Sequence, residues 1–469
     1  MENTKNITAG KATEICKGTL LSGNQNTVLY DFVKDTRELN KGDMYVGLSG
    51  ERFQGSILWE EALKLGAKGV LVEKIEISES KIKEYADRVI IKVEDTTRAL
   101  QELAEYKRKQ FDIPVIAVTG SVGKTSTKDM IASVLKQKYN VHKTAGNYNN
   151  HIGLPLTILG LKEEHTALIT EMGMNHFGEI SLLTKIAKPT VAVITNIGTA
   201  HIGNLGSREN ILKAKLEILE GLTEGGTVII NNDNDLLHSW QAKENHYNIK
   251  TYGIENKSDY NAKNIKLNQD GSTFDIKIGN DLLNVKVPVG GSHFVYNALC
   301  AICVGNYFNI PINKILKGIE EVDLTKKRME IIKKENYCII NDCYNASYDS
   351  MKPAIEYLHK VDGIRKIAVL GDMLELGEYS QQLHEKVGEV VAQNKIDKLI
   401  TVGELSKDIA KKAQELGMKS ENIIMCNSTS EAAEILKKNI IDNTVILLKA
   451  SNAMKFNTIL EILTGKEVE

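Results

Sequence analysis

A glycine-rich loop with one lysine, at residues 119–126, contains the residue types that most directly predict chemistry. It reads Thr-Gly-Ser-Val-Gly-Lys-Thr-Ser, after the β-branched run 113–119 and before an expected helix over 128–135. Glycines let backbone N–H groups point at phosphate oxygens, the lysine reaches the terminal phosphates, and the threonine can ligate Mg²⁺. A chance Gly-Lys-Thr turn is the alternative, and the strand-loop-helix setting argues against it. We therefore predict ATP or GTP binding by Gly120, Ser121, Val122, Gly123, Lys124, Thr125 and Ser126.

Two further side chains that can bind cations stand at the ends of later predicted strands. Glu171 ends the run 166–171, and His201 follows the run 190–195. Ligands of parallel α/β sheets collect outside the carboxyl ends of the strands, so a carboxylate and an imidazole there could hold a second cation beside the nucleotide. Each residue alone has an ordinary alternative as a structural or surface side chain. Lys215 by itself is read as a solvated helix lysine.

The composition is that of a globular protein without a nucleic-acid partner. Of 469 residues, 42% are hydrophobic and 26% are charged, as in average folded domains. The formal net charge of −2 provides no basic field for a polyanion. The opening residues are polar and no long apolar stretch occurs, so we expect a cytoplasmic protein without membrane insertion. The expected oligomeric state is a monomer. Cys300 and Cys303 form a C-x-x-C in a run that predicts a buried helix, which favours core thiols over a metal site.

The alternation of strand-like and helical segments predicts an α/β fold in three domains. A small α/β domain is expected over residues 1–109. Residues 110–324 predict a central P-loop domain with a parallel sheet, and a polar stretch at about 255–285, with the turn Asp270-Gly271, predicts appended antiparallel strands. Residues 325–469 predict a Rossmann-like domain without the G-x-G-x-x-G fingerprint. The clearest strands are predicted at 166–170, 190–195, 227–231, 338–341, 366–370, 398–402, 422–425 and 444–448.

The order of several motifs along the chain resembles that of the Mur ligases. These motifs are the short phosphate loop, Gly-Asn-Tyr-Asn-Asn-His-Ile-Gly-Leu-Pro at 146–155, Glu171, His201, and Gly-Ser-His-Phe-Val-Tyr-Asn at 291–297. The resemblance runs from end to end of the chain. Because that family uses a shortened T-G-x-x-G-K-T loop, Val118, where the longer phosphate-loop pattern has glycine, is normal within it.

Further segments are similar to the branch of the family that adds D-alanyl-D-alanine to UDP-N-acetylmuramoyl-tripeptide. They are residues 342–346, 350–352 and 370–377 with His384, while residues 35–37, 42–43 and 50–53 are similar to its UDP-sugar-binding domain. The resemblance implies an ATP-dependent amide ligase in cell-wall precursor synthesis. The tripeptide carboxylate would take the γ-phosphate of ATP, and the dipeptide amine would attack the acyl phosphate. ATP, two Mg²⁺ ions and the two substrates are the implied ligands.

The resemblance also implies roles for individual residues. Lys124, Glu171, His201 and Lys215 would form the catalytic set. Thr125 and Glu171 would hold the Mg²⁺ on the nucleotide, while Glu171, His201 and a carbamylated Lys215 would hold the second ion; Lys213 is the less favoured match. Nucleotide contacts outside the loop are implied for Asn297, Arg328 and Asp342. Substrate contacts are implied for Thr36, Arg37, Asn147, Asn149, Asn150 and Asn345.

Each of the outer nucleotide contacts has an alternative. Asn297 could be a polar residue near a helix N-terminus, and Arg328 with Asp342 could form an interdomain ion pair. On the nucleotide interpretation, Arg328 and Asp342 reach the site only when the third domain closes on the central one.

The chain departs from the family pattern at three places. Gln54-Gly55-Ser56 stands where the family commonly has Asp-Gly-His, and Asn452 stands where it commonly has arginine. The missing arginine puts in doubt a contact to the dipeptide or to an anion. Ser347 replaces a proline, which affects loop stiffness.

Three other functions remain open. They are a tripeptide-forming Mur ligase, a folylpolyglutamate synthase, and an ATP-binding module without ligase activity. Residues 342–346 argue against the first two, and a folate enzyme would not need the UDP-sugar domain. The intact Lys124, Glu171, His201 and Lys215 argue against the third.

Overall fold

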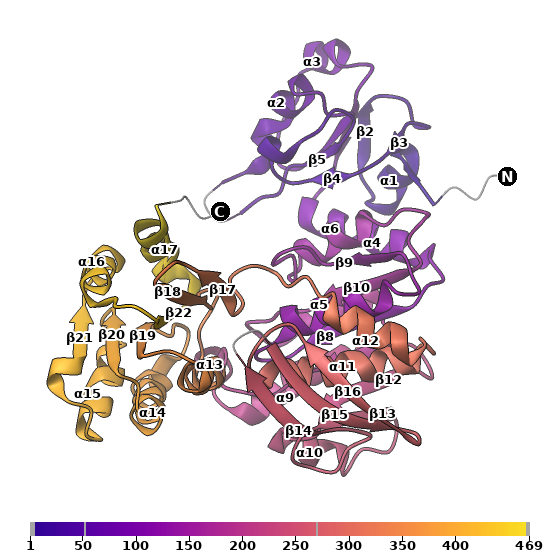
Figure 1. The fold of residues 1–469 in the computed structure, drawn as a ribbon. Coiled ribbons are helices and arrows are strands. Elements are labelled where there is room, and N and C mark those ends of the chain that lie inside the picture. Colours follow the sequence, from indigo (N-terminus) through magenta and orange to yellow (C-terminus); the bar gives the residue numbers. More distant parts are fainter. Residues whose placement is uncertain (1–4, 51–52, 269–270, 466–469) are drawn as a thin grey trace. The chain divides into compact units, whose positions relative to one another are not determined.

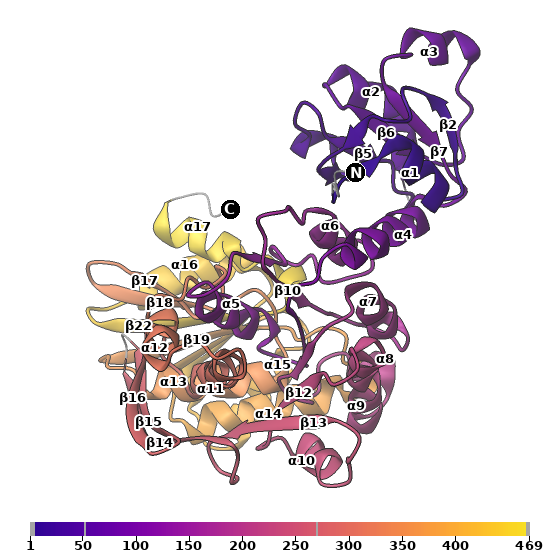
Figure 2. The same cartoon turned by 90° about the vertical axis from the view of Figure 1, so that its right-hand side faces the viewer.

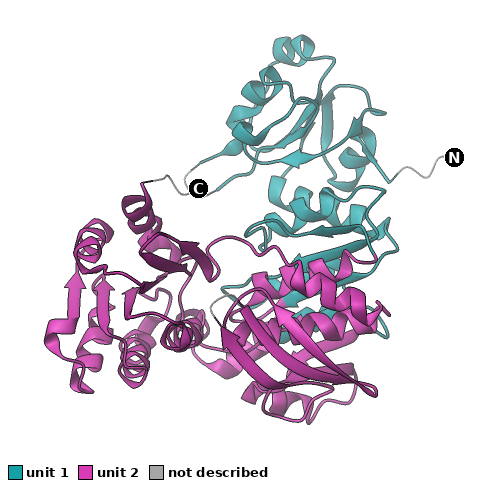
Figure 3. Ribbon diagram, viewed as in Figure 1, with its two compact units in different colours: residues 1–118, 139–192, 216–226 teal, residues 119–138, 193–215, 227–469 magenta. Residues whose placement is uncertain are grey.

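The computed structural model describes residues 5–50, 53–268 and 271–465. They form two compact units (Figure 3). Unit 1 comprises residues 1–118, 139–192 and 216–226, and unit 2 comprises residues 119–138, 193–215 and 227–469. Glu51 and Arg52 of the predicted UDP-sugar motif, and Asp270 of the predicted turn, lie outside the described residues.

Unit 1 begins with a small α/β layer built on a five-stranded sheet (Figure 1). In spatial order its strands are β2 (Thr19–Ser22), β7 (Val89–Lys92), β6 (Gly69–Val72), β5 (Met44–Val46) and β4 (Phe32–Val33). Strands β4 to β7 are parallel, and β2 is antiparallel to β7. A separate antiparallel pair joins β1 (Ile7–Thr8) to β3 (Val28–Leu29). The helices are α1 (Ala9–Ile15), α2 (Trp59–Lys64), α3 (Glu79–Glu84) and α4 (Thr96–Lys109).

The rest of unit 1 centres on three parallel strands. They are β9 (Val141–Lys143), β10 (Ala167–Glu171) and β8 (Val115–Thr119), in that order. Helices α6 (Gly153–Leu159) and α7 (Glu179–Ala187) belong to this part. Every residue of β8 is buried, as expected for a β-branched run inside a parallel sheet. The carboxyl end of β8 leads directly into the phosphate loop.

Unit 2 begins with helix α5 (Lys124–Leu135), which packs against α11 (Ser292–Tyr307) and α12 (Ile312–Glu320). The chain enters the unit again through β11 (Val191–Ile194). Strands β12 (Thr227–Asn231), β13 (Asn248–Gly253) and β14 (Tyr260–Asn268) are parallel. The other helices of this part are α8 (Ile202–Leu205), α9 (Arg208–Leu216) and α10 (Asp235–Gln241).

An antiparallel extension follows β14. Strands β15 (Gly271–Ile278) and β16 (Asp281–Val287) pair with it in order, and the three lie side by side in Figures 1 and 2. This confirms the antiparallel strands predicted near 255–285. Phe274, Ile276 and Val285 are buried on one face of the extension, which gives it an apolar side to pack.

The C-terminal part of unit 2 is a six-stranded sheet (Figure 1, orange to yellow). Its strands, in spatial order, are β17 (Glu330–Lys333), β18 (Tyr337–Asn341), β22 (Thr444–Lys449), β19 (Arg365–Gly371), β20 (Lys398–Val402) and β21 (Ile423–Cys426). All are parallel except β17. The helices are α13 (Tyr348–Lys360), α14 (Ser380–Gln393), α15 (Lys407–Glu415), α16 (Thr429–Asn439) and α17 (Asn457–Thr464). This confirms the predicted Rossmann-like alternation of strands and helices. The sequence did not predict the antiparallel edge strand β17.

The structure agrees with the sequence that Cys300 and Cys303 are core thiols. Cys300 and Cys303 are buried free thiols of α11. Within the described residues, no group of three His, Cys, Asp or Glu side chains is arranged to hold a metal ion. In the same part of the chain, every helix is too short or too polar to cross a membrane.

Candidate active site

The phosphate loop owes its shape to two glycines in conformations that other residues rarely adopt. Gly120 has φ of +150° and Gly123, the residue before α5, has φ of +80°. A Cβ on Gly120 would lie 1.9 Å from Oγ1 of Thr195, so this position has no room for a side chain. Glycine is therefore required at 120 by space as well as by conformation.

Residues that follow β11 clasp this loop from one side. The backbone N–H of Ser121 donates to the carbonyl of Asn196 at 3.0 Å, and the N–H of Val122 donates to Oδ1 of Asn196 at 3.0 Å. The carbonyl of Val122 accepts from Oγ1 of Thr195 at 2.7 Å and from Nδ2 of Asn196 at 3.0 Å. Oγ of Ser121 accepts from the N–H of Gly198 at 2.9 Å. We name this set of contacts the loop clasp.

We expect Gly120→Ala to weaken ATP binding sharply. The added methyl group would displace either Thr195 or the loop, and a misplacement of about 1 Å at a reacting centre can cost roughly a hundredfold in rate. Steady-state kinetics with ATP as the varied substrate measure the effect. Gly225→Ala is the control, since Gly225 has φ of +72° but a Cβ added there would have nothing within 4 Å. Equal kinetics in the two variants would contradict the argument.

Helix α5 begins at Lys124 itself, four residues before the predicted start. Its first N–H groups and the positive end of its dipole therefore face the loop, which favours an anion there. Nζ of Lys124 donates to the carbonyl of Gly120 at 2.9 Å, so the side chain bends back over the loop. This arrangement fits the predicted phosphate-binding role of residues 120–126.

Asn297 lies beside the start of α5. Its Oδ1 accepts from Oγ1 of Thr127 at 2.9 Å, whereas its buried Nδ2 has no hydrogen-bond partner among the described residues. A buried amide donor left unpaired is costly, and a ligand acceptor such as a base edge would satisfy it. Asn297 lies on the second turn of α11 rather than at its first residue, and the free donor favours the nucleotide role over a helix-end role.

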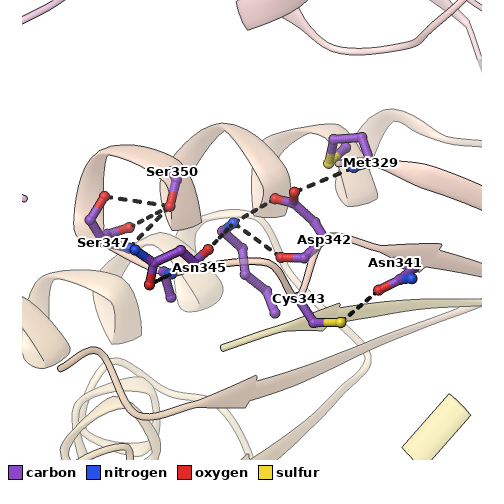
Figure 4. Close-up of polar contacts among 9 residues, drawn as sticks. Met329, Asn341, Asp342, Cys343, Asn345, Ser347 and Ser350 are labelled. Atoms are coloured by element: carbon purple, nitrogen blue, oxygen red, sulfur yellow. Dashed lines mark hydrogen bonds and ion pairs between the residues drawn. The ribbon is translucent and has the colours of Figure 1, made fainter. Parts of the chain in front are cut away.

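Arg328 brings the segment before β17 to the phosphate loop. Its Nη2 donates to Oγ1 of Thr125 at 3.2 Å, and its Nε is buried without a partner in the described part of the chain. Asp342 follows β18, where its Oδ1 accepts from the N–H of Met329 at 3.3 Å (Figure 4). Arg328 and Asp342 are thus linked through Met329 rather than by the direct ion pair that the sequence left open.

The structure distinguishes Lys215 from its neighbour Lys213. Lys215 is 1% exposed on α9, whereas Lys213 is exposed to solvent. Burial lowers the pKa of Lys215 well below its usual value, and the nearby charge of Lys124 lowers it further. A neutral amine is the form that reacts with CO₂, so Lys215 has the environment that a carbamylated lysine needs. The solvated helix lysine suggested by the sequence pattern alone is wrong for this position.

His201 is held in a left-handed conformation, with φ of +64°, directly before α8. Its Nδ1 lies 2.7 Å from Oε2 of Glu375, in a direction that does not meet hydrogen-bond geometry at Nδ1. The contact with the His201 side chain lowers the pKa of Glu375. The carbonyl of Glu375 also accepts from the N–H of Gly203 at 3.2 Å. Nothing in the sequence spacing pointed to Glu375 as the partner.

Glu171 and Asn149 come together in unit 1. Glu171, 2% exposed at the end of β10, accepts from Nδ2 of Asn149 at 2.8 Å through Oε1. Its backbone N–H donates to Oγ1 of Thr144 at 3.0 Å. Gly173 allows the close approach, because a Cβ there would be 3.0 Å from the Asn149 side chain. A buried carboxylate oriented in this way suits the predicted ligand role of Glu171.

The other predicted substrate residues have local structural contacts. Oδ1 of Asn150 accepts from the N–H groups of Ile152 and Gly153 at the start of α6. Asn147 and Asn345 are exposed, and Oδ1 of Asn345 accepts from the N–H of Ala346. These contacts leave the substrate roles as predictions.

Thr36 and Arg37 form the short 3₁₀ turn Thr36–Glu38. Arg37 is 87% exposed and pairs with Asp35, whose pKa its hydrogen bonds lower to about 2. The guanidinium is therefore occupied locally, and a substrate phosphate would have to compete with Asp35 for it.

The departure at Gln54-Gly55-Ser56 has a structural explanation. Oγ of the fully buried Ser56 donates to the carbonyl of Gly47 and accepts from the N–H of Glu73, both at 2.9 Å. Nε2 of Gln54 donates to the carbonyls of Glu73 and Lys74. The two side chains thus tie the ends of β5 and β6 together.

Three family models match successive parts of the chain. They are "Mur ligase family, catalytic domain" at residues 33–108, "Mur ligase middle domain" at 118–305 and "Mur ligase, glutamate ligase domain" at 327–452. The chain is 40% identical to the UDP-N-acetylmuramoyl-tripeptide--D-alanyl-D-alanine ligase of Bacillus subtilis, over 97% of this chain and 98% of that protein.

Solved structures agree with these matches. MurF from Acinetobacter baumannii superposes with a TM-score of 0.87 at 30% identity, covering 98% of this chain and 99% of that one. MurF ligase from Thermotoga maritima in complex with ADP gives a TM-score of 0.80 at 30% identity, covering 92% and 96%. The predicted three-domain α/β architecture is confirmed. The exact boundaries at 109/110 and 324/325 stay a prediction.

Proposed function

Because the chain belongs to the Mur ligase family, we propose that it joins D-alanyl-D-alanine to UDP-N-acetylmuramoyl-tripeptide with ATP, in peptidoglycan precursor synthesis. The observation that carries the proposal is a clasped phosphate loop whose Thr125 meets Arg328. It occurs in a chain similar over 97% of its length to a ligase of that name.

The reaction has two steps. A carboxylate oxygen of the tripeptide attacks the γ-phosphorus of ATP, the bond to the β-phosphate oxygen breaks, and ADP leaves. The amine of the dipeptide then attacks the acyl carbon, phosphate leaves with the oxygen, and the nitrogen loses a proton as the amide forms. The first step brings a carboxylate up to a polyphosphate, and the second develops negative charge on the acyl oxygen and the leaving phosphate, so most of the work is positioning and charge neutralisation.

The residues of the phosphate loop supply that neutralisation in unit 2. The start of α5 presents the positive end of its dipole to the phosphates, and Lys124 adds a full positive charge. The N–H groups of Ser121 and Val122 are bonded to Asn196 instead. Arg328 brings a second cation to Thr125, with one buried donor free to contact a phosphate oxygen. Asn297 offers its unpaired amide N–H to the base. Together these groups orient the nucleotide without any covalent step on the protein.

Divalent cations belong to the same proposal. The hydroxyl of Thr125, the ring of His201 and a carbamate on Lys215 are the proposed Mg²⁺ ligands of unit 2, and Glu171 is the proposed ligand of unit 1. Carboxylate, carbamate and hydroxyl oxygens are ligands that Mg²⁺ prefers, and the buried Lys215 with its lowered pKa fits the carbamate requirement. Bound Mg²⁺ would neutralise charge on the transferring phosphoryl group.

We expect phosphate release to require all three substrates. The assay supplies Mg²⁺-ATP with UDP-N-acetylmuramoyl-tripeptide in its lysine or its diaminopimelate form, and D-alanyl-D-alanine is present or withheld. Mass spectrometry of the pentapeptide product identifies the preferred tripeptide. Release without the dipeptide would indicate another ligase of the family, and ATP binding without any turnover would indicate a binding module. Free D-alanine in place of the dipeptide is the matched control.

A further inference from the structure

Lys449 is a buried cation at the end of an otherwise uncharged strand. It closes β22, every residue of which is buried, and is itself 2% exposed. Its Nζ lies 2.5 Å from Oδ2 of Asp342, 3.3 Å from the Asp342 carbonyl and 3.1 Å from the Asn345 carbonyl. An ammonium group has three N–H donors, and here each has an acceptor. Lys449 therefore fixes both ends of the segment 342–345.

Asp342 connects Lys449 to Met329, the residue that follows Arg328. One carboxylate oxygen is bound to Lys449. The other accepts from the N–H of Met329 (Figure 4). Lys327 and Met329, on either side of Arg328, have φ of +65° and +53°. Left-handed conformations are unfavourable for such residues, so they persist only where surrounding contacts hold them. The bond from Met329 to Asp342 is one such contact.

Tyr344 gives the same segment a second route to Arg328. Cζ of Arg328 lies 3.9 Å from the centroid of the Tyr344 ring, and Nη2 of the same guanidinium donates to Thr125. Stacking on an aromatic face fixes the plane of a guanidinium and therefore the direction of its donors. Tyr344 lies between the two residues that Lys449 holds. A chain of contacts thus runs from Lys449 through residues 342–345 and Arg328 to the phosphate loop.

We propose that Lys449 is a positioning residue for nucleotide binding, acting through Asp342, which anchors the segment that carries Tyr344 to Arg328. The proposal rests on the ATP site of the proposed function. Lys449 touches no substrate itself; it sets where the Asp342 carboxylate and the Arg328 guanidinium are presented. A neutral side chain at 449 would leave the Asp342 charge uncompensated and free the segment to move.

The test is a double-mutant cycle of Lys449→Met, Asp342→Asn and both together. Lys398→Met is the matched control, because Lys398 is a lysine on strand β20 of the same sheet whose Nζ contacts the Glu421 carbonyl at 3.4 Å. The readouts are ADP affinity by titration calorimetry, KM for ATP and for D-alanyl-D-alanine, and the midpoint of thermal unfolding. Calorimetry needs no turnover, so it tests Lys449 even if the proposed ligase reaction fails in the wild-type protein.

We expect Lys449→Met to weaken ADP binding and raise KM for ATP by about tenfold or more, with KM for the dipeptide within about twofold of wild type. The double variant should bind ADP as weakly as Asp342→Asn alone, because Lys449 acts through that residue. A lower unfolding midpoint with unchanged ADP affinity would overturn the proposal, since Lys449 would then be structural only.

If Lys449→Met does not fold, the double variant decides, because it lacks the uncompensated carboxylate charge. ADP affinity equal to that of Asp342→Asn supports the proposal. ADP affinity about tenfold lower than that of Asp342→Asn would show that Lys449 acts independently of Asp342 and would contradict the proposal.

Discussion

Lys124→Ala is expected to lower kcat by at least about 10²–10³-fold while the protein stays folded. The substitution removes the one full positive charge that the phosphate loop carries at the start of α5, where negative charge gathers during phosphoryl transfer. Loss of a single group that stabilises such charge costs about 10²–10³ in kcat. Alanine suits a helix, so α5 itself should form normally. Phosphate release in the three-substrate assay measures the loss, and circular dichroism with thermal unfolding checks the fold.

Lys136→Ala is the appropriate control for that experiment. Lys136 caps the other end of α5 and is exposed, so the same change there removes a lysine from the helix without touching the loop. It should leave kcat within about twofold, as surface substitutions usually do. Wild-type rates in Lys124→Ala would remove the basis for the phosphate-loop assignment.

Lys215→Ala is expected to lower kcat by at least about 10²-fold, and short-chain carboxylates added to the assay should restore part of the rate. The reason is that a carbamate at this position presents carboxylate-like oxygens, which acetate or formate can supply in the space that the lysine leaves. A second readout does not depend on activity. Wild-type protein equilibrated with ¹³CO₂ should show a carbamate carbon signal by NMR, and Lys215→Ala should lack it.

Lys213→Ala is the matched control, because Lys213 is two residues away on the same helix but exposed. It should retain both its activity and the carbamate signal. A carbamate signal that vanishes in Lys213→Ala and persists in Lys215→Ala would reverse the assignment. Loss of activity in Lys215→Ala without any carbamate signal in wild type would mean that the lysine acts as an amine.

The buried strands of the fold were predictable from the sequence. The run 227–231 coincides with β12, and 398–402 coincides with β20. Both are buried β-branched runs, whose composition alone identifies them. Strand β17 was missed because it has only two apolar residues, flanked by the charged Glu330 and Lys333, and charged residues are common on edge strands. The start of α5 was placed too late because the helix takes in the polar lysine and threonine of the loop itself.

The residue types of the chemical site were predictable from the sequence, but the contacts between those residues were not. The glycines, Lys124 and Thr125 follow from their spacing, since a phosphate loop is one local segment. The loop clasp does not, because Thr195 and Asn196 lie more than 70 residues away in sequence. The same limit applies to Lys449, whose partners are over 100 residues away. The available sign of Lys449 in the sequence was a single charged residue at the end of an apolar, strand-like run.

The loop clasp has a consequence for the kinetics of nucleotide exchange. Hydrogen bonds within the protein, rather than contacts to phosphate, set the curvature of residues 120–123. A nucleotide therefore meets a cradle that the protein already maintains, and little conformational entropy of the loop is lost on capture. The loop loses this conformational entropy when the protein folds, before any nucleotide binds. Capture of ATP should then be fast, and the residence time of ADP should depend on how firmly Arg328 and Asn297 hold the two ends of the molecule.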